Sequence, residues 1–447
     1  MNPAGILREY EGTQFGDKRL DRRLLKLAEL VARDSEQSFP RLMSEAELEA
    51  AYRFFGNEKV IPDELLKAHR DATLERAKGH DCVVAHDTTT FSFRAGGSRR
   101  GLGTGTKGSQ VLHGHVSLVA DGSHNALGVV GFRTFATTRA TEEQERWYEQ
   151  ALSVAEAMGT KRVVHVMDRE ADVYSLYCRL KEAGVRFVVR AQHDRRITTE
   201  NGDSKLRKAL SSHSIVSRKV WLGHRSNLGK STKNRRIHPE REEREALLDF
   251  SASTVTLKRP LPSETSFPEV TTLNVVRAWE QEPPEGEEGV EWILFTTEPV
   301  STPESILKVV DFYCNRWVVE EFFRALKSGC SIEERQLESA HSLTNAIALL
   351  LPIAWSLLNL RTAFREYPDE PASRILTPQE MTILRACSKK PLPKNPTIRE
   401  TILAIARLGG HLPRNGPPGW ITLGRGYEEL RTLQRGFLLA QAEGREM

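Results

Sequence analysis

The hydrophobic and polar positions recur with a helical period at the two ends of the chain and with a strand period between them. In the N-terminal 79 residues this pattern predicts three helices. The first follows Asp17, the second lies between Ser44 and Gly56, and the third begins at Pro62, all common helix boundaries. One side of the first helix is apolar and the other is basic, with Lys18, Arg19, Arg22, Arg23 and Lys26. Such a basic face either lies along DNA phosphates or faces solvent.

From residue 82 the period changes to that of strands. The stretch CVVAHDTTTFSF is predicted to be a strand with Asp87 in its middle, and two more strands follow, joined by a turn near Asp121. A helix capped by Thr141 and Gln144, a buried strand ending at Asp168, a second helix and a last strand, VRFVVRA, complete the order β-β-β-α-β-α-β. Three antiparallel strands followed by α/β crossovers predict a mixed sheet with helices on its faces.

Residues 193–300 interrupt this order with further strand patterns, which predict a β-rich insertion before a helix near residue 320. The first part of the insertion is rich in lysine and arginine, and the glutamates of HPEREEREALL dilute that charge. This part is either a solvated loop or a DNA-binding loop. From residue 338 the chain is predicted to be helical, with helices near 342–366, 377–388, 397–408 and 426–442.

Residues 311–329 carry the most informative polar pattern of the chain. Read as one helix at about 100° per residue, they place four polar side chains within a sector of roughly 60°. These side chains are Tyr313, Arg316, Glu320 and Lys327. A carboxylate beside a phenol, a guanidinium and an ammonium suits a metal ion and a phosphodiester, or a solvated face with ion pairs. Glu321 projects roughly 100° further round the helix, so Glu320 is the expected metal ligand. Glu321 is expected to be a solvated or structural residue whose partner is Arg324 or a residue of the insertion.

The predicted strand order matches the ribonuclease-H-like fold, in which carboxylates on the first strand, the fourth strand and a later helix meet at one end of the sheet. Asp87, Asp168 and Glu320 occupy these three places. Carboxylate oxygens suit Mg²⁺, and a pair of such ions can stabilise the attacking and leaving oxygens of a displacement at phosphorus. Glu170 and Asp172, which follow Asp168, are explained by an acidic first turn that matches a helix dipole.

The composition fits an ordinary globular protein, with 28% charged and 39% hydrophobic residues. The formal net charge is only +4, so a nucleic-acid surface has to come from clustered basic residues. The five cysteines form no C-x-x-C pair, and the N-terminus has no apolar signal segment. The most apolar run, residues 346–358, is predicted to be a buried core helix. We therefore expect a cytoplasmic protein with reduced thiols and no membrane partner.

Several segments together carry a family resemblance. HDTTTFSF contains the first aspartate, VMDREADVYSL contains the second, and a Y-x2-R-x3-E-x6-K pattern runs from residue 313 to 327. AYRFFGN and AIARLGG lie outside the predicted sheet. All five are similar to segments of the bacterial cut-and-paste DDE transposases of the IS-four group, which includes the Tn-five transposase. The resemblance spans nearly the whole chain.

This resemblance implies a Mg²⁺ cofactor, for which Mn²⁺ can substitute, and double-stranded DNA as substrate, both transposon ends and target. It also implies a homodimer in a synaptic complex. The tyrosine, arginine and lysine of the signature, here Tyr313, Arg316 and Lys327, are implied to contact DNA phosphates near the cleaved end. The family's base-stacking tryptophan corresponds to Trp292, and its FVVR arginine corresponds to Arg190.

We therefore predict an α/β protein with a ribonuclease-H-like mixed sheet. Residues 1–79 form a helical DNA-binding domain that uses Arg19, Arg22 and Arg23, residues 80–337 form the catalytic domain with its β insertion, and residues 338–447 form a helical dimerisation domain. The expected activity is Mg²⁺-dependent nicking of transposon ends, hairpin formation by the freed 3′-hydroxyl, and strand transfer to target DNA. A non-catalytic end-binding regulator and a ribonuclease-H-like nuclease without strand transfer are the alternatives.

Overall fold

The structure of the 447-residue chain is a computed structural model. It describes residues 6–94, 99–105, 108–136, 140–200, 202–210, 213–222, 241–260, 266–287, 289–388, 390–412, 414 and 416–443. Most of the basic loop predicted at the start of the insertion, residues 223–240, lies outside the described residues. The chain forms two compact units. The first comprises residues 1–139 and 317–447, and the second comprises residues 140–316.

Short helices begin the first unit, and those that follow Asp17 and Ser44 begin where the sequence predicts them. The Asp17 carboxylate accepts a hydrogen bond from the Arg19 amide at 2.9 Å, Ser44 caps the third of these helices, and Gly56 ends it. The helix predicted after Pro62 is divided at Leu66. The helices are α2 (Lys18–Arg33), α3 (Phe39–Leu42), α4 (Glu45–Phe55), α5 (Pro62–Leu65) and α6 (Lys67–Arg76).

The sheet of the first unit is antiparallel, as predicted. Its strands are β1 (Cys82–Phe93), β2 (Gly103–Thr104), β3 (Gln110–Asp121) and β4 (Ala126–Phe135). β3 pairs with β1, β2 and β4, and Asp87 of β1 lies opposite Val116 of β3. At the turn between β3 and β4, the Asp121 side chain accepts hydrogen bonds from the amides of Ser123 and Asn125. This polar turn fixes the register of the hairpin.

The remaining elements of the first unit follow residue 316. They are α12 (Trp317–Arg324), the π-helical turn η3 (Ala325–Gly329), the 3₁₀ turns η4 (Ile332–Glu334) and η5 (Ala372–Arg374), and helices α13 (Ala340–Glu366), α14 (Pro378–Cys387), α15 (Ile398–Leu408) and α16 (Trp420–Glu443). Among the described residues, α13 alone is long and apolar enough to cross a membrane by length and composition. It is a core helix, because 89% of its most apolar window is buried inside the protein.

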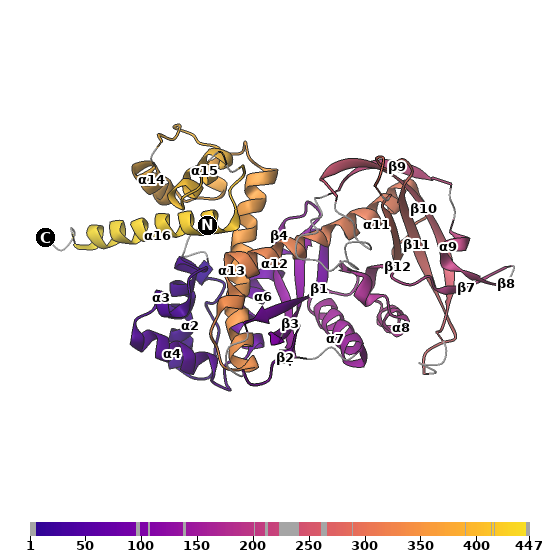
Figure 1. Ribbon diagram of the computed structural model, residues 1–447, viewed down its shortest axis with the longest axis horizontal. Helices are drawn as coiled ribbons and strands as arrows, with labels where there is room; N and C mark the ends of the chain where they lie inside the picture. The colour runs from indigo at the N-terminus through magenta and orange to yellow at the C-terminus, as the bar shows by residue number, and fades with distance from the viewer. Residues whose placement is uncertain are drawn as a thin grey trace. The chain divides into compact units, whose positions relative to one another are not determined.

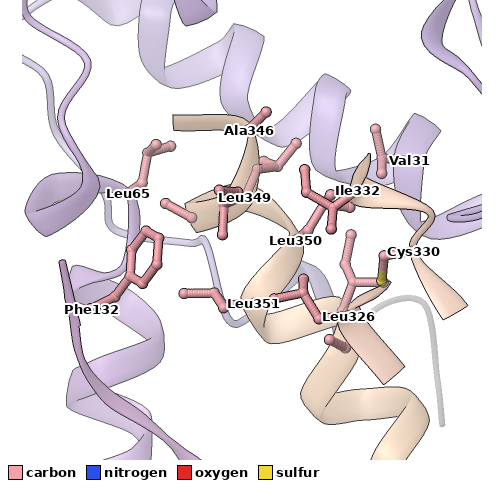
Figure 2. Packing of buried hydrophobic residues seen from close by; sticks show 14 of the residues in the cluster. Val31, Leu65, Phe132, Leu326, Cys330, Ile332, Ala346, Leu349, Leu350 and Leu351 are labelled. Atoms are coloured by element: carbon pink, nitrogen blue, oxygen red, sulfur yellow. The ribbon is translucent and has the colours of Figure 1, made fainter. Parts of the chain in front are cut away.

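The first unit is organised around α13. This helix contacts α4, α5 and β4 as well as α12 and η3. Figure 2 shows Val31, Leu65, Phe132, Leu326 and Leu350 converging in the resulting cluster, which joins residues from both ends of the chain. The helices of residues 1–79 therefore share one hydrophobic core with the sheet and with α12. The domain boundaries at residues 79 and 337 stay a prediction.

The second unit contains a mixed sheet flanked by helices (Figure 1). β5 and β6 are parallel, and the antiparallel order β6-β12-β11-β10-β7-β8 continues from them, with β9 also paired to β10. The elements are α7 (Ala140–Met158), β5 (Val163–Met167), η2 (Arg169–Ala171), α8 (Tyr174–Glu182), β6 (Arg186–Arg190), β7 (Arg196–Thr199), β8 (Gly202–Lys205), α9 (Leu206–Ala209), β9 (Val216–Leu222), β10 (Arg244–Lys258), β11 (Val270–Glu280), β12 (Glu291–Thr296) and α11 (Pro303–Asn315).

The predicted insertion does not form a sheet of its own. Its last strand, β12, pairs with β6, so β12, β11 and β10 continue the sheet beyond β6. One face of this sheet packs through Phe187, Ile293 and Phe295 against Trp147 of α7 and Tyr177 of α8. Helix α11 contacts β5, β6, β10 and β11. The protein is thus mixed α/β, with helical segments before and after the sheets.

Helices α15 and α16 approach each other so closely that only glycine fits at the contact. A Cβ atom added to Gly426 would lie 1.8 Å from the carbonyl oxygen of Ile405. We expect Gly426→Ala to lower the free energy of unfolding by about 1–3 kcal/mol, because the helices must separate. Gly436→Ala in the same helix meets no atom within 4 Å and should raise helix stability by roughly 0.5–1 kcal/mol. Urea unfolding followed by circular dichroism tests this, and equal effects of the two variants would contradict it.

Candidate functional site

Asp87 lies on the core-facing side of β1. Successive side chains of a strand alternate between its two faces, so Asp87 shares a face with Ala85, Phe91 and Phe93, all of which belong to the core of the first unit. One carboxylate oxygen of Asp87 accepts a hydrogen bond from the Thr88 amide at 2.8 Å. The residue is only partly buried. The core side of β1 also receives helix α12, which contacts this strand.

Glu320 and Lys327 lie on the segment that packs against β1. Helix α12 buries Phe322 in the core and leaves Glu320 partly exposed. The Lys327 ammonium donates a hydrogen bond of 2.7 Å to the carbonyl of Thr90 and lies 5.6 Å from the centre of the Phe91 ring. Burial lowers the pKa of Lys327, and Glu333 acts in the opposite direction. The first unit thus brings the strand of Asp87 into contact with the segment of Glu320 and Lys327.

The single regular helix predicted for residues 311–329 is wrong. Helix α11 ends at Asn315, Arg316 forms a turn, α12 begins at Trp317, and η3 is π-helical. A π-helical turn holds more residues than an α-helical one, so a constant 100° per residue does not apply. The backbone therefore does not place the four polar side chains in one common sector of a helix, contrary to the prediction. Tyr313 and Arg316 belong to the second unit and are buried, whereas Glu320 and Lys327 belong to the first.

Glu321 has the structural role that its predicted direction suggested. Its carboxylate forms an ion pair with Arg324, as expected, and a second one with Arg361 of α13 at 3.4 Å. These contacts join α12 to the central helix of the first unit.

In the second unit, Asp168 and Arg190 lie at the same edge of the sheet. Asp168 follows β5, and its side chain accepts a hydrogen bond of 2.9 Å from the Glu170 amide at the start of η2. The parallel register pairs Met167 with Val189, the residues that precede Asp168 and Arg190. The two predicted site residues therefore leave neighbouring strands side by side.

The second unit also holds four of the residues predicted to contact DNA, namely Arg190, Trp292, Tyr313 and Arg316. The Arg190 guanidinium donates to the carbonyl of Glu291 at 3.3 Å, next to Trp292 in the neighbouring strand. The Trp292 ring lies 5.8 Å from the ring of Tyr313, and the Arg316 guanidinium lies 5.9 Å from that same ring. Trp292 is only 4% exposed. An indole in this position can stack on a base only after it leaves its packing against Tyr313.

Asp172 has a role that the sequence interpretation missed. It is 3% exposed and accepts hydrogen bonds from the amides of Gln192 and His193 at 2.6 and 2.8 Å. The Arg195 guanidinium and the Tyr177 hydroxyl each donate to it at 2.7 Å. Burial and this carboxylate raise the pKa of Tyr177 well above its ordinary value, which keeps the hydroxyl a donor. The explanation of Asp172 by a helix dipole is wrong. The Asp172 side chain instead ties the loop after Asp168 to the segment after β6.

The three carboxylates predicted to bind metal have suitable oxygen donors. Their oxygen atoms are the ligands that Mg²⁺ and Mn²⁺ prefer, so the donor chemistry of Asp87, Asp168 and Glu320 fits either ion. In the part of the chain that the structure describes, however, no group of three or more histidine, cysteine, aspartate or glutamate side chains is arranged to hold a metal. Asp168 belongs to the second unit and the other two carboxylates to the first.

The basic face predicted for the first helix is present on α2. The Arg19 side chain is 84% exposed and forms an ion pair with Asp17 at 3.2 Å. Arg22 is exposed and donates to the carbonyl of Lys18 at 3.2 Å, and Arg23 is partly buried. Two of the three arginines of α2 that are predicted to bind DNA are thus on the solvent side of the helix.

Comparison with known proteins gives two family matches. Residues 6–60 match the family described as transposase DNA-binding, and residues 78–357 match the family described as transposase DDE domain. A cryo-EM structure of a piggyBac transposase synaptic complex with hairpin DNA is similar over 98% of this chain and 70% of that chain. The identity is 12% and the TM-score 0.32. A similarity this low supports no residue-by-residue correspondence.

The contacts of Asp172 predict a large effect of neutralising it. Asp172→Asn removes the negative charge beside buried Arg195, and a buried charge without compensation costs about 3–5 kcal/mol of unfolding free energy. The matched control is Asp203→Asn, whose carboxylate pairs with Arg196 and Lys258 at a site 40% exposed. That change should have a much smaller effect, because solvent screens an exposed ion pair. Urea unfolding of both variants measures the difference, and a loss at Asp172 no larger than at Asp203 would show that the network is not stabilising.

Proposed function

The chain belongs to the transposase DDE domain family, and from this membership we propose that it is a metal-dependent, Tn-five-like DNA transposase of the IS-four group. A DDE domain of a transposase catalyses phosphoryl transfer on DNA, and the match at residues 6–60 adds DNA binding. The observation that carries the proposal is the packing of the Glu320 and Lys327 segment on the strand of Asp87, with Lys327 bonded to the Thr90 carbonyl.

The strand connections support a ribonuclease-H-like catalytic domain. The first unit has the antiparallel order β4-β3-β1, and the second begins with the parallel pair β5-β6. Three antiparallel strands followed by a parallel pair with helical crossovers are the five core strands expected from the sequence. In this proposal β10, β11 and β12 are an extension of that core.

We propose Asp87, Asp168 and Glu320 as the ligands of Mg²⁺, with Mn²⁺ able to replace it. When bound, such an ion supplies an activated water and stabilises charge on the oxygens around phosphorus. The side chains of Lys327, Arg190 and Arg316 bind and orient the DNA phosphates. Guanidinium and ammonium groups are suited to this role because they donate several hydrogen bonds to phosphate oxygens.

The N-terminal segment is proposed to bind the transposon ends. Arg19 and Arg22 of α2 are exposed, so both can approach phosphates without a change in the packing of the helix. Arg23 is partly buried and serves at the edge of this surface. We also propose that the protein acts on ends and target as a homodimer in a synaptic complex, in the cytoplasm of a bacterial cell.

The decisive test compares the two adjacent glutamates of α12. Glu320→Gln and Asp87→Asn should lower Mg²⁺-dependent nicking of a duplex that carries the terminal inverted repeat by at least about a hundredfold, since each removes a metal ligand. Glu321→Gln should keep most of the activity, because its carboxylate pairs with Arg324 and Arg361. Circular dichroism verifies folding of all variants. An inactive Glu321 variant beside an active Glu320 variant would disprove the assignment.

The hairpin step predicts a separate effect at Trp292. Extruding a base from the stack costs a few kcal/mol, and stacking on an aromatic ring returns about 1–3 kcal/mol. Because Trp292 also packs on Tyr313, Trp292→Phe is the suitable change, since it keeps an aromatic ring at that contact. We expect normal nicking and slower hairpin formation, measured on denaturing gels. Equal losses in both steps, together with a lower melting temperature, would assign Trp292 to packing alone.

A further inference from the structure

Arg335 is a buried arginine that binds backbone carbonyls of two distant segments. It is 2% exposed, and burial lowers its pKa to about 10. The guanidinium donates hydrogen bonds to the carbonyls of Ser35 at 2.5 Å, Gln37, and Cys330 at 2.9 Å, and it lies 4.6 Å from the Phe39 ring centre. The first two carbonyls belong to the linker between α2 and α3, and the third follows η3.

A second contact fastens the same two segments. The Ser35 hydroxyl donates a hydrogen bond of 2.7 Å to the carbonyl of Gly329, the last residue of η3. Beside these polar contacts, Figure 2 shows Val31 of α2 in the same core cluster as Leu326, Cys330 and Ile332. The end of α2 is therefore held to residues 325–335 by packing and by side-chain hydrogen bonds.

Residues 325–335 hold the strand of Asp87 on their other side. Lys327 donates to the carbonyl of Thr90, and the Glu333 carboxylate accepts a hydrogen bond of 2.8 Å from the Ser92 amide. The segment also departs twice from regular backbone: η3 is π-helical, and Ser331 has a left-handed φ of 44°. Such departures persist only where surrounding contacts determine them, and they gather at functional sites.

We propose that Arg335 is a positioning residue, through which DNA bound by the N-terminal helices sets the placement of Lys327 and Glu320 against β1. This inference rests on the proposed function and deepens it. A shift of α2 reaches the linker that follows this helix, and the linker is bonded to Arg335. Because the packed core resists deformation, the shift passes to residues 325–335 and from there to β1.

The chemistry of arginine explains why this position requires it. A guanidinium presents five donors in one plane, so it can bind carbonyls of two segments at once. A lysine ammonium keeps the charge but is a single point that cannot reproduce this fork. Arg385 offers a matched control, because its guanidinium also donates to two backbone carbonyls, those of Leu392 and Lys394, in the C-terminal helical part of the first unit.

The test compares Arg335→Lys, Ser35→Ala and Arg385→Lys in the full chain, with a duplex carrying the inverted repeat that flanks the gene. We expect Arg335→Lys to bind the duplex like the unchanged protein while its Mg²⁺-dependent cleavage at saturating DNA falls about tenfold. Hydrogen exchange supplies a readout that does not need catalysis. DNA should protect residues 325–335 in the unchanged protein and in Arg385→Lys, and this protection should be lost in Arg335→Lys. Ser35→Ala should show the same changes at smaller size.

Unchanged cleavage together with unchanged protection in Arg335→Lys would overturn the inference. Parallel losses of DNA binding, melting temperature and cleavage would also overturn it, because they indicate a structural role alone. If Arg335→Lys does not fold, the Ser35→Ala variant decides the question. If DNA then protects residues 325–335 of Ser35→Ala from hydrogen exchange as strongly as in the unchanged protein, the coupling is refuted. If no variant cleaves DNA, yet protection of residues 325–335 still depends on Arg335, the proposed function fails and the coupling stands.

Discussion

The burial of α13 is the constraint on which the first unit depends. A helix that is apolar on all sides is stable only when other elements surround it. The elements that surround α13 are α4 and α5 from the N-terminal part of the chain, α12 and η3 from the segment just before α13, and β4 from the sheet. Polar side chains at α13 fix these neighbours: Asn345 donates to the carbonyls of Phe55 and Val60, and Trp355 donates to the carbonyl of Ala126. The site residues on β1 and α12 are placed by this packing.

The elements governed by local signals could be predicted from the sequence. Asp17 and Ser44 cap their helices, and Asp121 closes its hairpin. Apart from the two-residue strand β2, the order of strands and crossover helices from β1 through β6 is as expected. These features depend on one residue and its near neighbours, so periodicity and capping rules suffice. The pairing of Glu321 with Arg324 is of the same kind, because the two residues lie three positions apart on one helix.

The features that depend on tertiary packing could not be predicted. The break at Arg316 and the π-helical turn at η3 arise where the chain passes from one compact unit to the other and then packs on β1. Helical periodicity contains no information on either. The extension of the sheet by β12 is a pairing over about a hundred residues of sequence, and the burial of Trp292 follows from it. The sequence places Asp87 on β1 and Asp168 after β5 as expected, whereas packing divides the segment of Tyr313, Arg316, Glu320 and Lys327 and decides which of these side chains are exposed.

Buried charged side chains fasten distant segments in both units. In the first unit, Glu9 binds His69 at 2.5 Å and Arg76 at 2.8 Å, and the Val129 amide donates to Nε2 of His69. That bond leaves the His69 proton on Nδ1, facing the Glu9 carboxylate. Burial of the imidazole lowers the pKa of His69, although the contact with Glu9 acts in the opposite direction. A buried charge is costly unless its bonds are satisfied, so each such group accepts few alternative arrangements. Asp172 and Arg335 follow the same rule beside the predicted site residues, where fixed geometry has the greatest effect on chemistry.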